Sequence, residues 1–168
     1  MTIVVADTSA LVSLGIVADR EPSPLEYLLE EYTVLTAAEV LDELETTASY
    51  EDDQGRAARA VLDRSDRIDV RESKIDSTVP LDDGENAAIT LANDETAAMF
   101  LCDEFNQLGI VHASLIDTRL VTTPKLIAVF ARNGLLAGDD AMALLEQMSD
   151  ARSWANNSYV QRAREAFE

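Results

Sequence analysis

Two aspartates stand where buried strands are expected to end. The run IVVA (3–6) is followed at once by Asp7, and the apolar run AAMFLC (97–102) is followed by Asp103. In an open parallel sheet, ligands bind beyond the carboxyl ends of the strands. An aspartate there can also do no more than cap the helix that follows. Each position is therefore a candidate for chemistry, and neither is sufficient alone.

Two glutamates lie beside apolar positions of expected helices. Glu85 begins the run 85–94, and the residues three, four and seven positions later are apolar, which places Glu85 on the core-facing side. Glu43 lies in the run 37–48, next to Leu44. Ionised side chains near a core are rare unless they are paired or bind a cation. The alternatives are a favourable acid in a first helical turn for Glu85 and a solvated boundary position for Glu43.

Together, the four acids indicate a site for a hard cation. Carboxylate oxygens without histidine or cysteine suit Mg²⁺ or Mn²⁺. The chain has one histidine, His112, and one cysteine, Cys102, so a zinc site built from several such ligands is not expected. A divalent cation would lower the pKa of a water molecule and offset charge on a phosphodiester. Metal-assisted phosphodiester cleavage is the chemistry that this set of residues favours.

The elements that must position these acids alternate along the chain. Strands are expected at 3–6, 33–36, 67–72, 97–103 and 109–114, with helices between them and two more helices near the C-terminus. Thr8 or Ser9 offers an N-cap for the first helix. The alternation predicts an α/β fold with a central parallel β-sheet and helices on both faces.

Length and composition favour one domain. The chain has 168 residues, 47% of them hydrophobic, which suits one core over about 3–136 with C-terminal helices over about 139–168. No apolar run approaches the roughly 18 residues that span a bilayer, and no basic leader precedes the first strand. We therefore expect a cytoplasmic protein with no membrane partner.

The charge is strongly acidic. There are 32 acidic and 13 basic residues, for a net charge of -19. Such a balance repels polyanions at low salt. It is typical either of an acidic interaction protein or of a protein from a salt-rich cytoplasm, where screening is short-ranged. Because the acids are scattered and form no tail, we favour the halophilic interpretation.

Four sequence blocks resemble the motif series of PIN-domain proteins. They are DTSALVSLG, VLDEL, LDDGENAAITLA and FLCDE, and the resemblance spans residues 3 to about 136. It is closest to the VapC-like toxin ribonucleases with a DTS start, and it implies a single PIN-like domain. In that family, the blocks supply an acidic quartet that binds Mg²⁺ or Mn²⁺ for RNA cleavage. The resemblance assigns the quartet to Asp7, Glu43, Glu85 and Asp103, with Glu104 as a second acid of the last motif and Glu39 as an alternative to Glu43.

The resemblance also implies partners: an RNA substrate, a second copy in a homodimer, and a small antitoxin protein if the chain is the toxin of a toxin–antitoxin pair. Thr8 and Ser9 could contact a phosphate or a water molecule. Arg56 and Arg59, three residues apart on an expected helix, could form a phosphate-binding strip. The alternative is that these arginines pair with nearby aspartates on a solvated surface.

Other functions fit less well. A PIN-like fold without activity, serving as a binding or scaffold module, is the main alternative, since one fold can host several functions. Phosphatases of the haloacid-dehalogenase type carry a second aspartate two residues after the first, where this chain has Ser9. Receiver-like signalling domains need an aspartate after the third strand, and the run RIDVRE (67–72) ends without one.

Overall fold

Five parallel strands form one sheet in the computed structural model, which describes residues 1–167. The strand order is β3-β2-β1-β4-β5, and every neighbouring pair is parallel. Parallel neighbours need long crossovers, which helices supply. The strands are β1 (Ile3–Ala6), β2 (Thr33–Ala37), β3 (Asp69–Arg71), β4 (Met99–Leu101) and β5 (Arg119–Val121). The predicted α/β fold class is confirmed.

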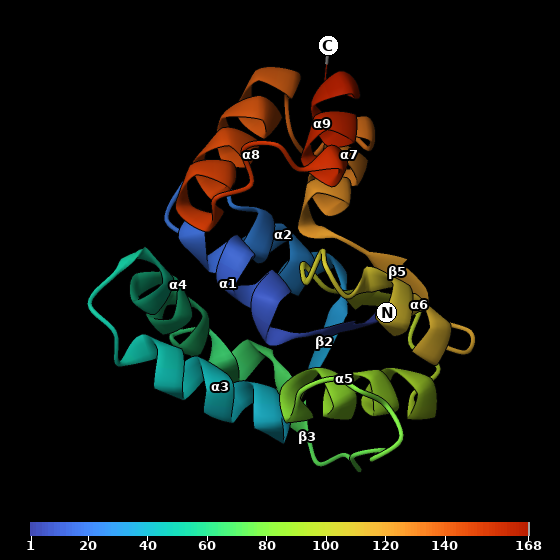
Figure 1. Cartoon of the computed structure of the whole chain (residues 1–168). Helices are drawn as coiled ribbons and strands as arrows, with labels where there is room; N and C mark the ends of the chain where they lie inside the picture. The colour runs from blue at the N-terminus through green and yellow to red at the C-terminus, as the bar shows by residue number, and fades with distance from the viewer. Residues whose placement is uncertain (168) are drawn as a thin grey trace.

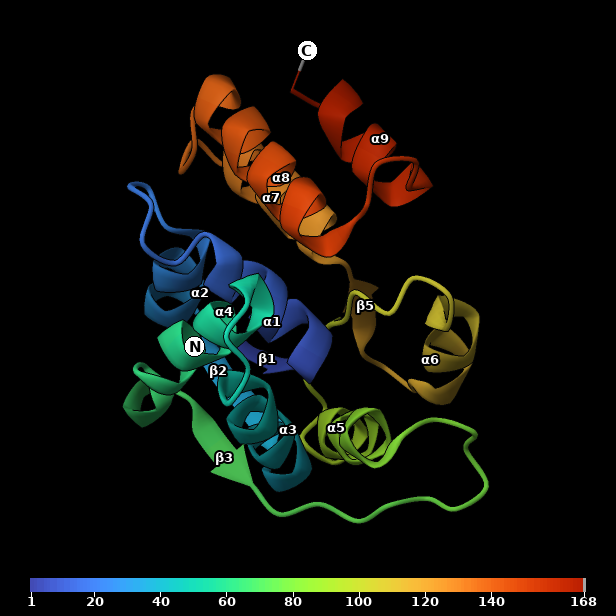
Figure 2. The same ribbon diagram turned by 60° about the vertical axis from the view of Figure 1, so that its left-hand side comes forward.

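Helices cover the sheet on both sides. In Figures 1 and 2, α3 and α5 lie on one side of the strands, α1 and α2 lie on the other, and α7, α8 and α9 form a further layer beyond α1. None of the helices in residues 1–167 is long and apolar enough to cross a membrane. The helices are α1 (Thr8–Ile16), α2 (Pro24–Glu31), α3 (Ala38–Ala48), α4 (Asp53–Leu62), α5 (Asp83–Asp94), α6 (Leu108–Ser114), α7 (Thr123–Arg132), α8 (Gly138–Arg152) and α9 (Ser158–Glu165).

The core lies on both faces of the central strand, β1, and of its neighbour β4. Val4 and Val5 of β1 and Phe100 of β4 are fully buried, as expected for parallel strands covered on both sides. The C-terminal helices belong to the same body, because α8 packs against α1 and α7 and buries Leu144 and Leu145. This packing holds the end of α8 close to the edge of the sheet where β1 and β4 end.

One predicted strand is wrong. Residues 109–114 form most of α6, and the fifth strand is β5, further along the chain. Leu108 and Val111, three residues apart, are buried, whereas Ile110 and His112 are exposed, which is a helical pattern. The actual edge strand has three residues and begins with the exposed Arg119, so its sequence carries almost no strand pattern.

Candidate functional site

The neighbouring strands β1 and β4 bring two aspartates together. Asp7 directly follows β1, and its backbone N–H donates to the carbonyl of Leu101 at the end of β4 at 3.1 Å. Asp103 lies two residues beyond that carbonyl. Asp7 and Asp103 are 1% and 5% exposed. Neighbouring parallel strands therefore place both carboxyl groups, as the sequence predicts, at the carboxyl edge of the sheet.

Ser9 connects these two aspartates. Its hydroxyl donates to Asp7 Oδ1 at 2.7 Å and accepts from the backbone N–H of Asp103 at 2.9 Å. Asp7 Oδ1 also accepts from the N–H of Ala10 at 3.0 Å, so Asp7 itself is the N-cap of α1. The prediction that Thr8 or Ser9 caps this helix is therefore wrong. The Thr8 hydroxyl instead donates to Glu43.

Two helices bring the glutamates to the same edge. Glu43 extends from α3 and Glu85 from the first turn of α5. The side chain of Asp82 caps α5 by accepting from the N–H of Glu85 at 2.8 Å. The glycine between them, Gly84, lies against Glu43 so closely that an added Cβ would overlap the Glu43 carboxyl group. The glycine thus allows α3 and α5 to bring the two glutamates side by side.

These side chains line a pocket of about 170 Å³, hereafter the acid pocket. Three of the four predicted acids, Asp7, Glu43 and Glu85, line it together with Glu104. Asp103 lines an adjoining pocket that shares Glu104. The other lining residues of the acid pocket are Thr8, Ser9, Val12, Gln54, Asp82 and Arg152.

The carboxyl groups of this site hold their protons more tightly than carboxyl groups exposed to water do. Burial raises the pKa of Asp7 to about 7, and burial together with nearby carboxylates raises that of Glu85 to about 8. Burial also raises the pKa of Glu43, Asp103 and Glu104. Clustered, buried carboxylates are unfavourable in their ionised form unless a positive charge accompanies them.

Four buried carboxylate oxygens have no hydrogen-bond partner within residues 1–167. Three of them, Asp7 Oδ2, Glu85 Oε2 and Asp103 Oδ2, belong to the acids at the carboxyl edge of the sheet, and the fourth is Glu39 Oε2, whose residue does not line the acid pocket. Unpartnered buried oxygens are uncommon and call for a ligand or a strained role. The side chains of the acid pocket surround a space. Within residues 1–167, no three acidic, histidine or cysteine side chains lie close enough together to hold a metal ion directly. An oxygen-only donor set around a space of several water volumes fits a hydrated hard cation, because Mg²⁺ characteristically keeps some of its waters.

The sequence did not identify three polar or charged residues of the acid pocket, Gln54, Asp82 and Arg152, nor its one apolar residue, Val12. Asp82 could have been found, because an aspartate three residues before a glutamate is a common start of a helix. Arg152 has no such signal. It is the last residue of α8, followed by Ser153 in the left-handed region at φ 60° and by the buried Trp154. This turn, anchored by Trp154 against Phe105, holds one cation near the acids. Burial raises the pKa of Asp103 and Glu104, and the charge of Arg152 offsets part of that rise.

The predicted phosphate strip lies elsewhere. Arg56 pairs with Asp53 within α4, and Arg59 donates to the carbonyls of Ala48 and Tyr50 at 2.6 and 3.1 Å. Neither arginine lines the acid pocket, and neither does Glu39, the alternative to Glu43.

A family model described as DUF3368, PIN domain, matches residues 3–168, nearly the whole chain. No curated protein matches the chain. With a parallel sheet, acids at the carboxyl ends of β1 and β4, and a match of this extent, the chain belongs to the PIN-domain family.

Proposed function

We propose that this protein is a Mg²⁺- or Mn²⁺-dependent endoribonuclease that hydrolyses RNA phosphodiester bonds in the acid pocket. The observation that carries the proposal is that three buried, unpartnered carboxylate oxygens, those of Asp7, Glu85 and Asp103, occur together at the carboxyl edge of the sheet. PIN domains are generally nucleases, which supports the same conclusion.

The acidic side chains and the two hydroxyl groups have different proposed roles. Asp7, Glu43 and Glu85, with Asp103 and Glu104, would hold the cation, which would offset phosphate charge and acidify an attacking water molecule. The Ser9 hydroxyl fixes Asp7 through Oδ1 and leaves Oδ2 free. The Thr8 hydroxyl orients Glu43 in the same way.

Arg152 supplies positive charge of a different kind. It lines the acid pocket and forms no ion pair within 4.0 Å with a described residue. A guanidinium group in this position can donate hydrogen bonds to the non-bridging oxygens of a phosphate. Arg152 therefore helps a polyanion to enter a pocket whose other ionisable residues are all acidic.

The test is cleavage of end-labelled single-stranded RNA with Mn²⁺ and with EDTA, comparing the natural chain with Asp7→Asn and Glu43→Gln. Glu39→Gln is the matched control on the same helix. We expect cleavage that needs Mn²⁺ and both pocket acids and is unaffected by Glu39→Gln. Cleavage that persists in EDTA or in Asp7→Asn would overturn the assignment, and a folded protein that binds no Mn²⁺ would support a scaffold role.

The resemblance to toxin ribonucleases extends the proposal to a homodimer and to a small antitoxin protein. The sedimentation mass in molar salt tests the dimer. Growth arrest on expression, relieved by a neighbouring small reading frame, tests the toxin role. Stability that rises with salt concentration tests the halophilic origin.

A further inference from the structure

A second pocket, of about 510 Å³, has the opposite charge from the acid pocket. It lies between α6, β5, α7 and α9 and is lined by His112, Lys125, Arg132 and Arg162 over an apolar floor that includes Leu120 and Ala128. None of its described lining residues is acidic. In a chain with 32 acidic and 13 basic residues, such a surface is unexpected. We refer to it as the basic groove.

Two helix faces build this groove. Lys125 and Arg132 are seven residues apart on α7, and Tyr159 and Arg162 are three apart on α9, so each pair lies on one side of its helix. Arg162 also lies over the Tyr159 ring, 5.8 Å from its centre. The packing of α7 against α9 therefore brings both basic faces to the same groove.

The cations of the groove are not occupied by acids of the described chain. Lys125, Arg132 and Arg162 form no ion pair within 4.0 Å with a described residue. The arginines of α4 and its surroundings differ, because Arg56 pairs with Asp53 and Arg64 pairs with Glu26. An anionic ligand at the basic groove would thus not have to displace an internal partner.

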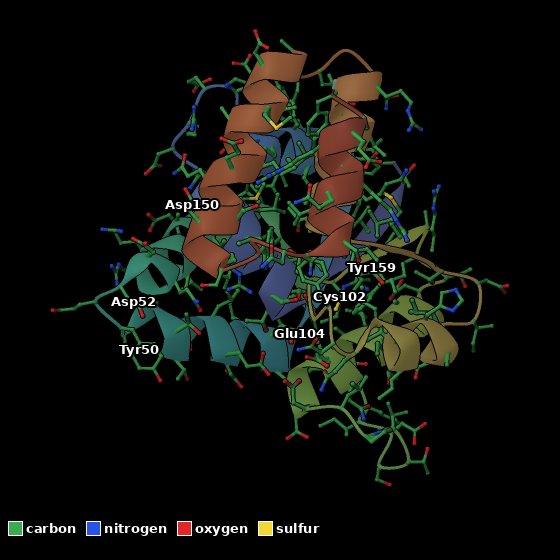
Figure 3. The ribbon with its side chains drawn as sticks, turned by 45° about the horizontal axis from the view of Figure 1, so that its top comes forward. Tyr50, Asp52, Cys102, Glu104, Asp150 and Tyr159 are labelled. Carbon is green, nitrogen blue, oxygen red and sulfur yellow. The ribbon has the colours of Figure 1, made fainter. Side chains whose placement is uncertain are left out.

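The basic groove connects to the acid pocket. Glu104 lines both the acid pocket and the adjoining pocket, whose wall also includes Phe105 and Asn157. Phe105 stacks on Tyr159 at 5.4 Å, and Tyr159 lines the basic groove. Figure 3 shows Glu104 and Tyr159 near the middle of one face, whereas Asp52, just before α4, lies at its side. Glu104 and the stacked rings of Phe105 and Tyr159 thus link the acid pocket, the adjoining pocket and the basic groove in one path.

We propose that the basic groove binds backbone phosphates of the RNA strand that flanks the cleavage site, an inference that rests on the proposed function for the identity of the ligand. A strand of several nucleotides can reach along the path, and its phosphates complement Lys125, Arg132 and Arg162. The apolar floor accommodates sugars. Bases find no open aromatic platform, because the Tyr159 ring is already stacked on Phe105 and approached by Arg162. Binding is consequently independent of base sequence.

The test is RNA affinity, measured by fluorescence anisotropy of a labelled single-stranded oligoribonucleotide. It is made in EDTA with the Asp7→Asn protein, in which we expect cleavage to be strongly reduced. Arg132→Glu with Arg162→Glu is compared with Arg56→Glu with Arg59→Glu, which changes the net charge equally. We expect the groove pair to weaken binding at least tenfold and to flatten the salt dependence by about 0.7 in log–log slope for each lost phosphate contact. The α4 pair should weaken it less than threefold.

Thermal melting first establishes that both double variants are folded, and Arg132→Gln with Arg162→Gln replaces the groove pair if it is not. Equal weakening by the two pairs, or no weakening by the groove pair, would overturn the inference, and the second result would point to a protein partner in the groove. Cleavage by the natural chain is measured separately. If the natural chain cleaves RNA and the groove pair binds RNA as well as the natural groove does, the inference about the basic groove fails and the proposed function stands. If binding depends on the groove but the natural chain does not cleave, the proposed nuclease function fails and RNA binding by the groove stands.

Discussion

Carboxylates in two regions of this molecule have opposite electrostatic environments. On the outer surface near α4, Glu26 accepts from Arg64 and Arg67 at 2.7 and 2.6 Å, and these arginines lower its pKa. In the acid pocket, burial raises the pKa of Asp7 to about 7 and of Glu85 to about 8. The same type of side chain is thus stabilised as an anion in one region and destabilised in the other.

The difference separates structural charge from functional charge. A paired surface acid already has its counter-ion and adds a little stability. Unpaired buried acids reduce stability, and such groups concentrate at functional sites. In a chain with so many acids, the clustering of several buried acids without partners identifies the candidate site better than the presence of acids does.

The largest effects on cleavage and stability are expected for Asp7→Asn. It removes an unfavourable buried charge and a proposed cation ligand, so we expect cleavage to fall on the order of a thousandfold. At pH 8 without metal, the variant should be more stable than the natural chain by as much as roughly 4 kcal/mol, because ionising Asp7 in the fold is what the raised pKa opposes. Urea unfolding and initial cleavage rates check both effects. Reduced stability in the metal-free variant would contradict the electrostatic argument.

The pH dependence of stability tests the same acids without mutation. Burial raises the pKa of Asp7 and Glu85 from 3.8 and 4.5 to about 7 and about 8, so the folded protein keeps these protons to higher pH than the unfolded chain does. Their contribution to metal-free stability is therefore greatest below about pH 4 and declines as the pH rises toward 8.

Mn²⁺ should reverse this loss, since it binds the ionised carboxylates of the folded state. We expect a shift in melting temperature of several degrees at pH 8, close to none at pH 5, and little in Asp7→Asn. Differential scanning calorimetry checks these shifts. A shift of equal size at both pH values would indicate metal binding outside the acid pocket.

Gly84→Ala tests the position of one carboxylate in the acid pocket, because it moves the Glu43 side chain without changing the charge. The added methyl overlaps the Glu43 carboxyl group and must displace it. We expect cleavage to fall about 10- to 100-fold with the melting temperature nearly unchanged, because alanine favours a helix. Gly138→Ala in α8 is the matched control, since its Cβ would meet only an ordinary contact at 3.6 Å. Equal rates in both variants would show that the position of Glu43 is not important.

The smallest effect is expected at the paired surface acid. Glu26→Gln should lower stability by about 0.5 kcal/mol at neutral pH and low salt, less in high salt, with cleavage unchanged. The lowered pKa of Glu26 means that this contribution is present above pH 4.5 and is lost as the pH falls through its folded value. Urea titrations at two salt concentrations measure it. A loss comparable to that of a buried group would contradict the distinction between the two regions.

The sequence carried much of the fold and of the site. Apolar runs that end on Asp7 and Asp103 predict buried strands and place both residues correctly, because strand burial leaves a direct hydrophobic pattern. The predicted strand at 109–114 failed because a short apolar run is compatible with both helix and strand. The sequence does not predict Arg152 as a site residue, because its position in the acid pocket depends on how α8 packs. The prediction of Arg56 as a phosphate-binding residue differs from the structure because a sequence does not show which cations already have acidic partners.

The hydroxyl of Ser9 joins residues that are far apart in the chain. It binds Asp7 and the backbone of Asp103, 94 positions later. A chain still growing on a ribosome has Asp7 long before it has β4, and it gains Arg152 later still. The acid pocket is therefore complete only after the chain has been made through Arg152 and β4 has inserted beside β1. Partial chains and proteolytic fragments that lack β4 should be inert, so the acquisition of activity would itself report that folding is finished.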